Sequence, residues 1–121
     1  MRRVLLDEGV PIGVREQLTG FSVVSAAEAG WAGLTNGDLI AAAEAAGFAI
    51  MVTADQNIRY QQNLKSRSLA LVVLTTNHWA TIRTYGAEIL ASVASADQGS
   101  YLTLELPKPA LRRRPPPRPG G

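Results

Sequence analysis

Apolar residues follow two alternating patterns along this chain: short continuous runs, and longer stretches with helical spacing. The short runs have the length of strands. One further short segment, the last in the chain, alternates between polar and apolar positions as a half-exposed edge strand does. The predicted strands cover 3–6, 21–24, 48–53, 69–74 and 101–106. Continuous apolar runs are typical of parallel strands, because helices cover both faces of a parallel sheet.

Helices are predicted between these strands. Pro11 suits the first turn of a helix that continues to about Leu18, because the first turn does not need its missing N–H. A second helix begins at Thr35. It ends at Gly47, because glycine is favoured at the C-terminal cap of a helix. The other two predicted helices are a polar one over 55–65 and a long amphipathic one over 78–96.

The alternation of strands and helices predicts a three-layer α/β/α sandwich around a mostly parallel sheet of about five strands. Right-handed crossovers favour the strand order 2-1-3-4-5, in which the first and third strands are adjacent. The chain has 121 residues, which is the size of one domain, and we assign that domain to residues 1–106. Residues 107–121 are rich in proline and arginine and are expected to be a disordered tail.

Composition excludes several kinds of site. The chain has no cysteine and one histidine, which excludes a Cys/His zinc site, a disulfide framework and a cysteine nucleophile. The apolar runs are too short for a signal peptide or a membrane span, so we expect a cytoplasmic protein with no membrane contact.

The net charge of +2 hides an asymmetry. Five of the twelve basic residues follow Leu106, whereas all ten acidic residues precede it. The expected domain is therefore acidic by about three charges, and the tail is basic. A basic tail can attract the phosphates of nucleic acid. A cloning remnant or a solubilising tail has the same composition.

Two predicted strands run directly into acidic residues. The first is followed by Asp7, and the third, which ends at Thr53, is followed by Asp55. Because ligands of open α/β sheets bind outside the carboxyl ends of the strands, adjacent first and third strands bring both carboxylates to one place. Close carboxylates repel unless a cation relieves them, and Mg²⁺ or Mn²⁺ prefers such oxygen ligands. The alternative is that Asp7 caps a turn and Asp55 caps the next helix.

Further polar residues belong to the same predicted edge. Asp38 opens the second helix, where it either joins the acids or only interacts with the helix dipole. Glu8 either supports Asp7 or faces solvent. Asn57 either offers an oxygen to the metal or is an ordinary residue of the helix. Thr53 can hydrogen-bond a carboxylate, and Asn77 follows the fourth strand at this edge.

The polar helix over 55–65 carries Arg59 among amide, basic and aromatic side chains. Such groups suit single-stranded RNA, because cations contact its backbone and flat side chains stack on its bases. A solvated helix face has a similar composition. We expect Trp31 and Trp79 to pack, and His78 to cap or pack beside a helix start.

The chain resembles the small PIN-like proteins related to the toxin nucleases of toxin–antitoxin pairs. Three motifs carry the resemblance: Leu5-Leu6-Asp7-Glu8, Gly37-Asp38-Leu39-Ile40 and Val52-Thr53-Ala54-Asp55-Gln56-Asn57. It covers about residues 3–106 and implies an α/β/α sandwich whose carboxylates hold Mg²⁺ or Mn²⁺ and cut RNA. By position, it assigns the catalytic and metal-binding roles to Asp7, Asp38 and Asp55. The family often has another acid where this chain has Asn57, so one charge is missing from the site.

The resemblance therefore implies a metal-dependent ribonuclease that hydrolyses RNA phosphodiester bonds. It also implies RNA as the substrate and a small acidic antitoxin protein as the partner. Exposed apolar groups on the last predicted helix could in addition support a homodimer.

Two functions of other classes remain open. A phosphoacceptor receiver domain has a similar sheet and length, with acids after the first strand, and here Thr75 and Lys108 follow the fourth and fifth strands. The second alternative is a catalytically inactive PIN-like module that acts through protein contacts, which Asn57 and the acidic domain both favour.

Overall fold

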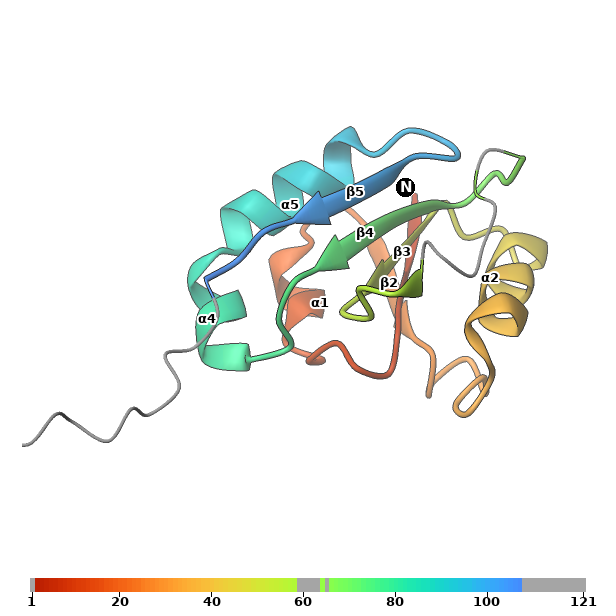
Figure 1. Ribbon diagram of the computed structural model, residues 1–121, viewed down its shortest axis with the longest axis horizontal. Coiled ribbons are helices and arrows are strands. Elements are labelled where there is room, and N and C mark those ends of the chain that lie inside the picture. Colours follow the sequence, from red (N-terminus) through yellow and green to blue (C-terminus); the bar gives the residue numbers. More distant parts are fainter. Residues whose placement is uncertain (1, 59–63, 65, 108–121) are drawn as a thin grey trace, which may run out of the picture.

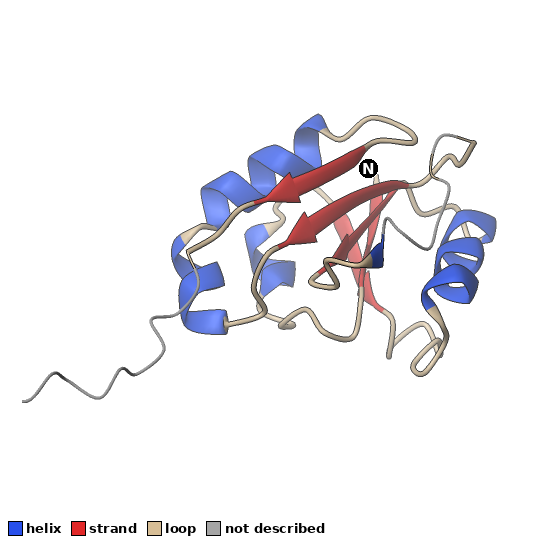
Figure 2. Ribbon diagram, viewed as in Figure 1, coloured by secondary structure: helices blue, strands red, loops and turns tan. Residues whose placement is uncertain are grey.

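The computed structural model describes residues 2–58, 64 and 66–107 and arranges them in three layers (Figure 1). The strands are β1 (Arg3–Leu6), β2 (Ser22–Ser25), β3 (Ile50–Thr53), β4 (Ala70–Leu74) and β5 (Tyr101–Leu104). The helices are α1 (Val14–Gln17), α2 (Asn36–Ala45), α4 (Trp79–Thr84) and α5 (Gly86–Ser95). Figure 2 shows the strands as one central sheet with helices on both of its faces.

The five strands form a single sheet in the order β2-β1-β3-β4-β5, and every neighbouring pair is parallel. The predicted strand order and the predicted α/β class are both confirmed. The register of β1 on β3 pairs Leu6 with Val52. The residues that follow these two, Asp7 and Thr53, therefore lie at the same carboxyl edge of the sheet.

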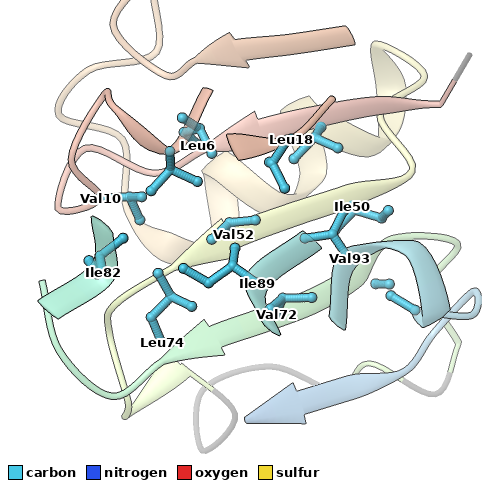
Figure 3. Packing of buried hydrophobic residues seen from close by; sticks show 14 of the residues in the cluster. Leu6, Val10, Leu18, Ile50, Val52, Val72, Leu74, Ile82, Ile89 and Val93 are labelled. Atoms are coloured by element: carbon cyan, nitrogen blue, oxygen red, sulfur yellow. The ribbon is translucent and has the colours of Figure 1, made fainter. Parts of the chain in front are cut away.

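Alternate residues of each central strand pack on opposite faces of the sheet. One set, which includes Leu6 and Val52, packs against residues of α1, α4 and α5, such as Ile82 and Ile89 (Figure 3). The other set packs against α2 and is represented by Leu5, Met51, Leu71 and Val73. Burial of β1, β3 and β4 on both faces explains why their sequences are continuously apolar.

The predicted helix over 78–96 is wrong as a single helix. It is divided into α4 and α5 at Tyr85, whose φ and ψ of −111° and 26° lie outside the helical range. The Gln17 side chain of α1 donates a hydrogen bond of 2.9 Å to the carbonyl of Ile82 and lies where a Cβ on Gly86 would meet it. The hydrogen bond from Gln17 thus occupies the Ile82 carbonyl near the break. Hydrophobic periodicity cannot predict such a contact between distant segments.

Other element boundaries also differ from those predicted: β3 and β4 begin at Ile50 and Ala70, later than expected, and β5 ends at Leu104, earlier than expected. The helix predicted over 11–18 is shortened to α1, because Val14, Arg15 and Glu16 each donate to a carbonyl three residues earlier, as in a 3₁₀ turn. The second strand begins at Ser22, because the N–H of Phe21 donates a hydrogen bond to the carbonyl of Leu18 in a turn.

The ends of the second predicted helix are confirmed. The Thr35 side chain accepts a hydrogen bond of 3.3 Å from the N–H of Asp38 and caps α2. Gly47 follows the helix with a φ of 86°, a conformation that glycine adopts at little cost. The helix predicted over 55–65 lies largely outside the described residues.

None of the helices in the described ranges combines the length and the apolar character that spanning a lipid bilayer requires.

Candidate functional site

Asp7 and Thr53 connect the ends of β1 and β3. The Thr53 hydroxyl donates a hydrogen bond of 2.7 Å to Oδ2 of Asp7. The other oxygen of this carboxylate, Oδ1, accepts from the N–H of Glu8 at 2.8 Å. The backbone N–H of Asp7 continues the β1–β3 ladder by donating to the carbonyl of Val52 at 2.9 Å. The carboxylate is thus fixed by the sheet and by a side chain from the neighbouring strand.

The same threonine also fixes Asp55. The Thr53 oxygen accepts from the N–H of Asp55 at 3.1 Å while its proton goes to Asp7, so one hydroxyl joins both acidic residues. The Asp55 carboxylate accepts from the N–H of Asn57 at 3.0 Å and from the side-chain amide of Asn36 at 2.8 Å. Asn36 is the first residue of α2, so this helix begins directly over the carboxyl edge.

Strand alternation explains why Thr53 points toward this network. Met51 packs on the α2 face of the sheet, and Thr53, two residues later, shares that face. Its side chain is fully buried, with an exposed fraction of 0%. A buried hydroxyl must find a donor and an acceptor, and here Asp7 and the Asp55 backbone supply them.

No basic residue neutralises Asp7 or Asp55 within the described part of the chain. The ion pairs found there join Arg15 to Glu28 and Arg67 to Glu44. The two carboxylates are therefore stabilised by neutral hydrogen-bond donors, which leave their charge in place. Both side chains are partly exposed, so solutes can reach this negative edge.

Asp38 does not complete a three-acid cluster with Asp7 and Asp55. It lies in the first turn of α2 with an exposed side chain, and Thr35 holds its backbone N–H. Across residues 2–58, 64 and 66–107, no three Asp, Glu or His side chains are arranged to hold a metal ion together.

Two carboxylates are nevertheless a sufficient protein contribution for some hard cations. Mg²⁺ is often bound through one or two carboxylates, with water and substrate phosphate as its other ligands. Each oxygen of Asp7 and Asp55 accepts one of the hydrogen bonds described above, and a carboxylate oxygen has two acceptor sites. The donor chemistry of this pair therefore fits Mg²⁺ or Mn²⁺.

Glu8 turns away from this pair. Its Oε1 accepts a hydrogen bond of 2.5 Å from the N–H of Gly33, in the loop that precedes α2. Gly33 has a φ of 84°, a conformation that side chains other than that of glycine rarely adopt. Glu8 thus fixes the loop that leads to Asn36, instead of facing Asp7.

The remaining predicted residues have separate positions. Asn57 has an exposed side chain, and its backbone N–H is what reaches Asp55. Asn77 is exposed in the segment between β4 and α4 and makes no hydrogen bond to either acid in the described part of the chain. Arg59 lies outside the described residues.

Two residues of this edge were missed by sequence reasoning. Asn36 holds Asp55, although the sequence marks it only as part of a helix start. Gln56 donates from its side chain to the carbonyl of Thr75 at 3.2 Å and so connects the ends of β3 and β4. The Asn36 contact depends on where α2 begins relative to the sheet, which no local motif specifies.

Thr75 uses its hydroxyl in hydrogen bonds to the backbone of Leu106, which weakens the receiver alternative. Its buried hydroxyl accepts from the N–H of Leu106 at 2.8 Å and lies 3.3 Å from the carbonyl of the same residue. This side chain therefore ties the end of β4 to the segment after β5. Lys108, which that alternative also requires, lies outside the described residues.

Comparisons with known proteins gave no match to a protein-family model, to a curated protein or to a solved structure.

Proposed function

We propose that this protein is a divalent-metal-dependent ribonuclease that hydrolyses RNA phosphodiester bonds at the carboxyl edge of its sheet. The observation that carries the proposal is the hydrogen-bonded unit of Asp7, Thr53 and Asp55. It joins the Asp7 carboxylate to the Asp55 backbone at the ends of adjacent parallel strands, beside the switch point of the sheet, and neither acid has a basic partner in the described residues.

In this proposal Asp7 and Asp55 provide the oxygen ligands of Mg²⁺ or Mn²⁺. The metal, when bound, supplies Lewis-acid activation of the phosphate and of the attacking water. Thr53 fixes the orientation of Asp7, and Asn36 fixes that of Asp55, so neither carboxylate must reorganise when a ligand arrives. Asp38 is the third acid that the motif resemblance assigns, and its place on the first turn of α2 keeps it at the margin of this unit.

RNA as the substrate and an antitoxin protein as the partner come from the resemblance of the three motifs to PIN-like toxin nucleases. The basic residues after Leu106 offer attraction for the RNA backbone.

The direct test compares cleavage of single-stranded RNA by the full chain and by Asp7→Asn and Asp55→Asn, with Mg²⁺, with Mn²⁺ and with EDTA. We expect cleavage that requires metal and falls by at least about 100-fold in both variants, since residues behind metal ligands alone cost about 10- to 100-fold. Asp97→Asn is the matched control, because Asp97 is exposed in the turn before β5, at the opposite edge of the sheet. Circular dichroism verifies that each variant folds.

The result that would overturn the proposal is metal-independent cleavage, or cleavage that Asp7→Asn leaves unchanged. Calorimetric titration with Mn²⁺ distinguishes the ribonuclease from the inactive module, because the inactive module predicts no saturable site that depends on Asp7. Incubation with a small phosphodonor separates the receiver alternative, which predicts a stable acyl phosphate on Asp55.

A further inference from the structure

Trp79 is one of three large apolar side chains that are exposed among the described residues. Its exposed fraction is 39%, and the other two are Ile12 at 56% and Leu34 at 40%. We expected this tryptophan to pack, and it does so with only part of its ring. An aromatic surface of this size left in water is a candidate contact surface for a ligand.

The indole ring of Trp79 packs closely against one neighbour, Gly13. The ring lies so near the backbone of Gly13 that a Cβ added there would overlap with three ring atoms. The helix that carries the ring is fixed as well, because Gln17 of α1 donates to the carbonyl of Ile82 in α4. These contacts restrict the motion of the ring, which lowers the entropy lost when a flat ligand stacks on it.

A basic side chain lies on the same side of α4. Arg83 follows Trp79 by four residues, a spacing that places two side chains on one helix face. Arg83 is exposed and forms no ion pair with any described residue. An aromatic ring beside an available guanidinium is the combination that binds single-stranded nucleic acid, because the ring stacks on a base and the cation contacts a phosphate.

The position of this pair connects it to the proposed site. Trp79 begins α4, shortly after the carboxyl end of β4, and Gly13 ends the loop that starts at Asp7. In Figure 1 the start of α4 and this loop lie at the same end of the sheet. An RNA strand whose phosphate is bound at the proposed metal site beside Asp7 would therefore extend toward Trp79.

We propose that Trp79 and Arg83 form a binding subsite for an unpaired nucleotide of single-stranded RNA, with the base stacked on the indole ring and a phosphate on the guanidinium. This inference rests on the proposed ribonuclease function and adds the residues that bind an unpaired nucleotide, because a base can stack on the ring only when it is free of a duplex.

Intrinsic fluorescence gives a test that does not depend on cleavage. The full chain with Asp7→Asn and Trp31→Phe keeps Trp79 as its single tryptophan and is titrated with a single-stranded RNA of about ten nucleotides, within the range of single-strand site sizes. We expect saturable quenching of Trp79 by this RNA and little quenching by a duplex of the same sequence. Equal quenching by both, or none by either, would overturn the inference.

Affinity measurements by anisotropy, in the Asp7→Asn background, test the two side chains separately. Trp79→Ala should weaken binding by about 5- to 100-fold, the effect of losing one stacked base, and Trp79→Phe should retain part of it. Arg83→Gln should lower the slope of log affinity against log salt by about 0.7, as expected for one lost contact to a single-strand phosphate. Trp31→Phe is the matched aromatic control and should leave the affinity unchanged.

The outcomes separate this inference from the function on which it rests. RNA cleavage that depends on Asp7, together with unchanged affinity in Trp79→Ala, rejects the subsite and retains the ribonuclease. Loss of self-association or of protein binding in Trp79→Ala, with RNA affinity intact, also rejects it and assigns the surface to a protein contact. A full chain that neither binds nor cleaves RNA rejects both proposals.

Discussion

Thr53, the last residue of β3, donates a hydrogen bond of 2.7 Å from its fully buried hydroxyl to the partly exposed carboxylate of Asp7, the residue that follows β1. The same oxygen accepts from the backbone of Asp55. This single side chain therefore links the Asp7 carboxylate to the backbone of Asp55.

Replacement of Thr53 by valine keeps the shape of the side chain and removes both hydrogen bonds. We expect Thr53→Val to lower the free energy of unfolding by about 1–3 kcal/mol, because the N–H of Asp55 loses its partner. Urea denaturation measures this loss, and RNA cleavage should fall with it. Thr53→Ser keeps the hydroxyl and is the control, so equal stability and activity of the two variants would contradict the assigned role.

Gly13 is required by its contact with Trp79 and not by its own backbone, whose φ of −60° suits any residue. Gly13→Ala should cost about 1–3 kcal/mol of stability, since the added Cβ forces the indole ring to move. In the Trp79→Ala background most of this cost should disappear, which a double-mutant cycle measured by urea denaturation detects. Gly9→Ala is a control, because no atom lies within 4 Å of its added Cβ. An equal cost of Gly13→Ala in both backgrounds would show that the contact is not its cause.

Glu44 links α2 to the segment before β4. Its carboxylate accepts from the Arg67 guanidinium at 2.5 Å and from the Ser68 N–H at 2.8 Å. Burial raises the pKa of Glu44, but the hydrogen bonds from Arg67 and from nearby backbone N–H groups outweigh it, so the net pKa is lowered. A lowered folded-state pKa stabilises the protein above the unfolded-state pKa, and this stabilisation is lost as the pH falls through the folded-state value.

We therefore expect Glu44→Gln to destabilise the protein at neutral pH, and the difference from the wild type to shrink as the solution is acidified through the range where carboxylates titrate. Denaturant midpoints measured from neutral to acidic pH follow this difference. Glu105→Gln, at an exposed position after β5, should change stability little. A deficit of Glu44→Gln that stays constant with pH would argue against a role for the charge.

Arg2 caps the C-terminal end of α5 at the amino edge of the sheet, where β1 begins. Its guanidinium donates to the carbonyls of Ala96 at 3.0 Å and Ala94 at 2.9 Å and lies over the ring of Phe21. Cations near a helix C-terminus satisfy free carbonyls and interact favourably with the dipole. Arg2→Gln should cost about 1 kcal/mol. Amide hydrogen exchange should accelerate in the last turn of α5 and not in α2, and uniform exchange rates would refute this local role.

The strands follow from the sequence because they depend on local composition, and their order follows because crossover handedness restricts it. Runs such as the one from Ala70 to Leu74 are apolar at every position, which only burial on both faces accommodates. Crossover handedness then leaves few orders, and the order with β1 beside β3 is the one formed. The cap at Thr35 and the turn at Gly47 are equally local, since each depends on residues within one helix turn.

The details of the candidate site depend on contacts between segments that are distant in the chain. The sequence alone placed Asp7 and Asp55 at the ends of adjacent strands, because strand ends and strand order are properties of pattern and chirality. Only the tertiary structure decided that Asn36 holds Asp55, that Glu8 binds the loop at Gly33, and that Asp38 forms no three-acid cluster with described residues. The reason is physical: the direction of a polar side chain is set by whichever donor or acceptor the packed helices and loops bring within about 3 Å, and hydrophobic periodicity carries no information about that partner.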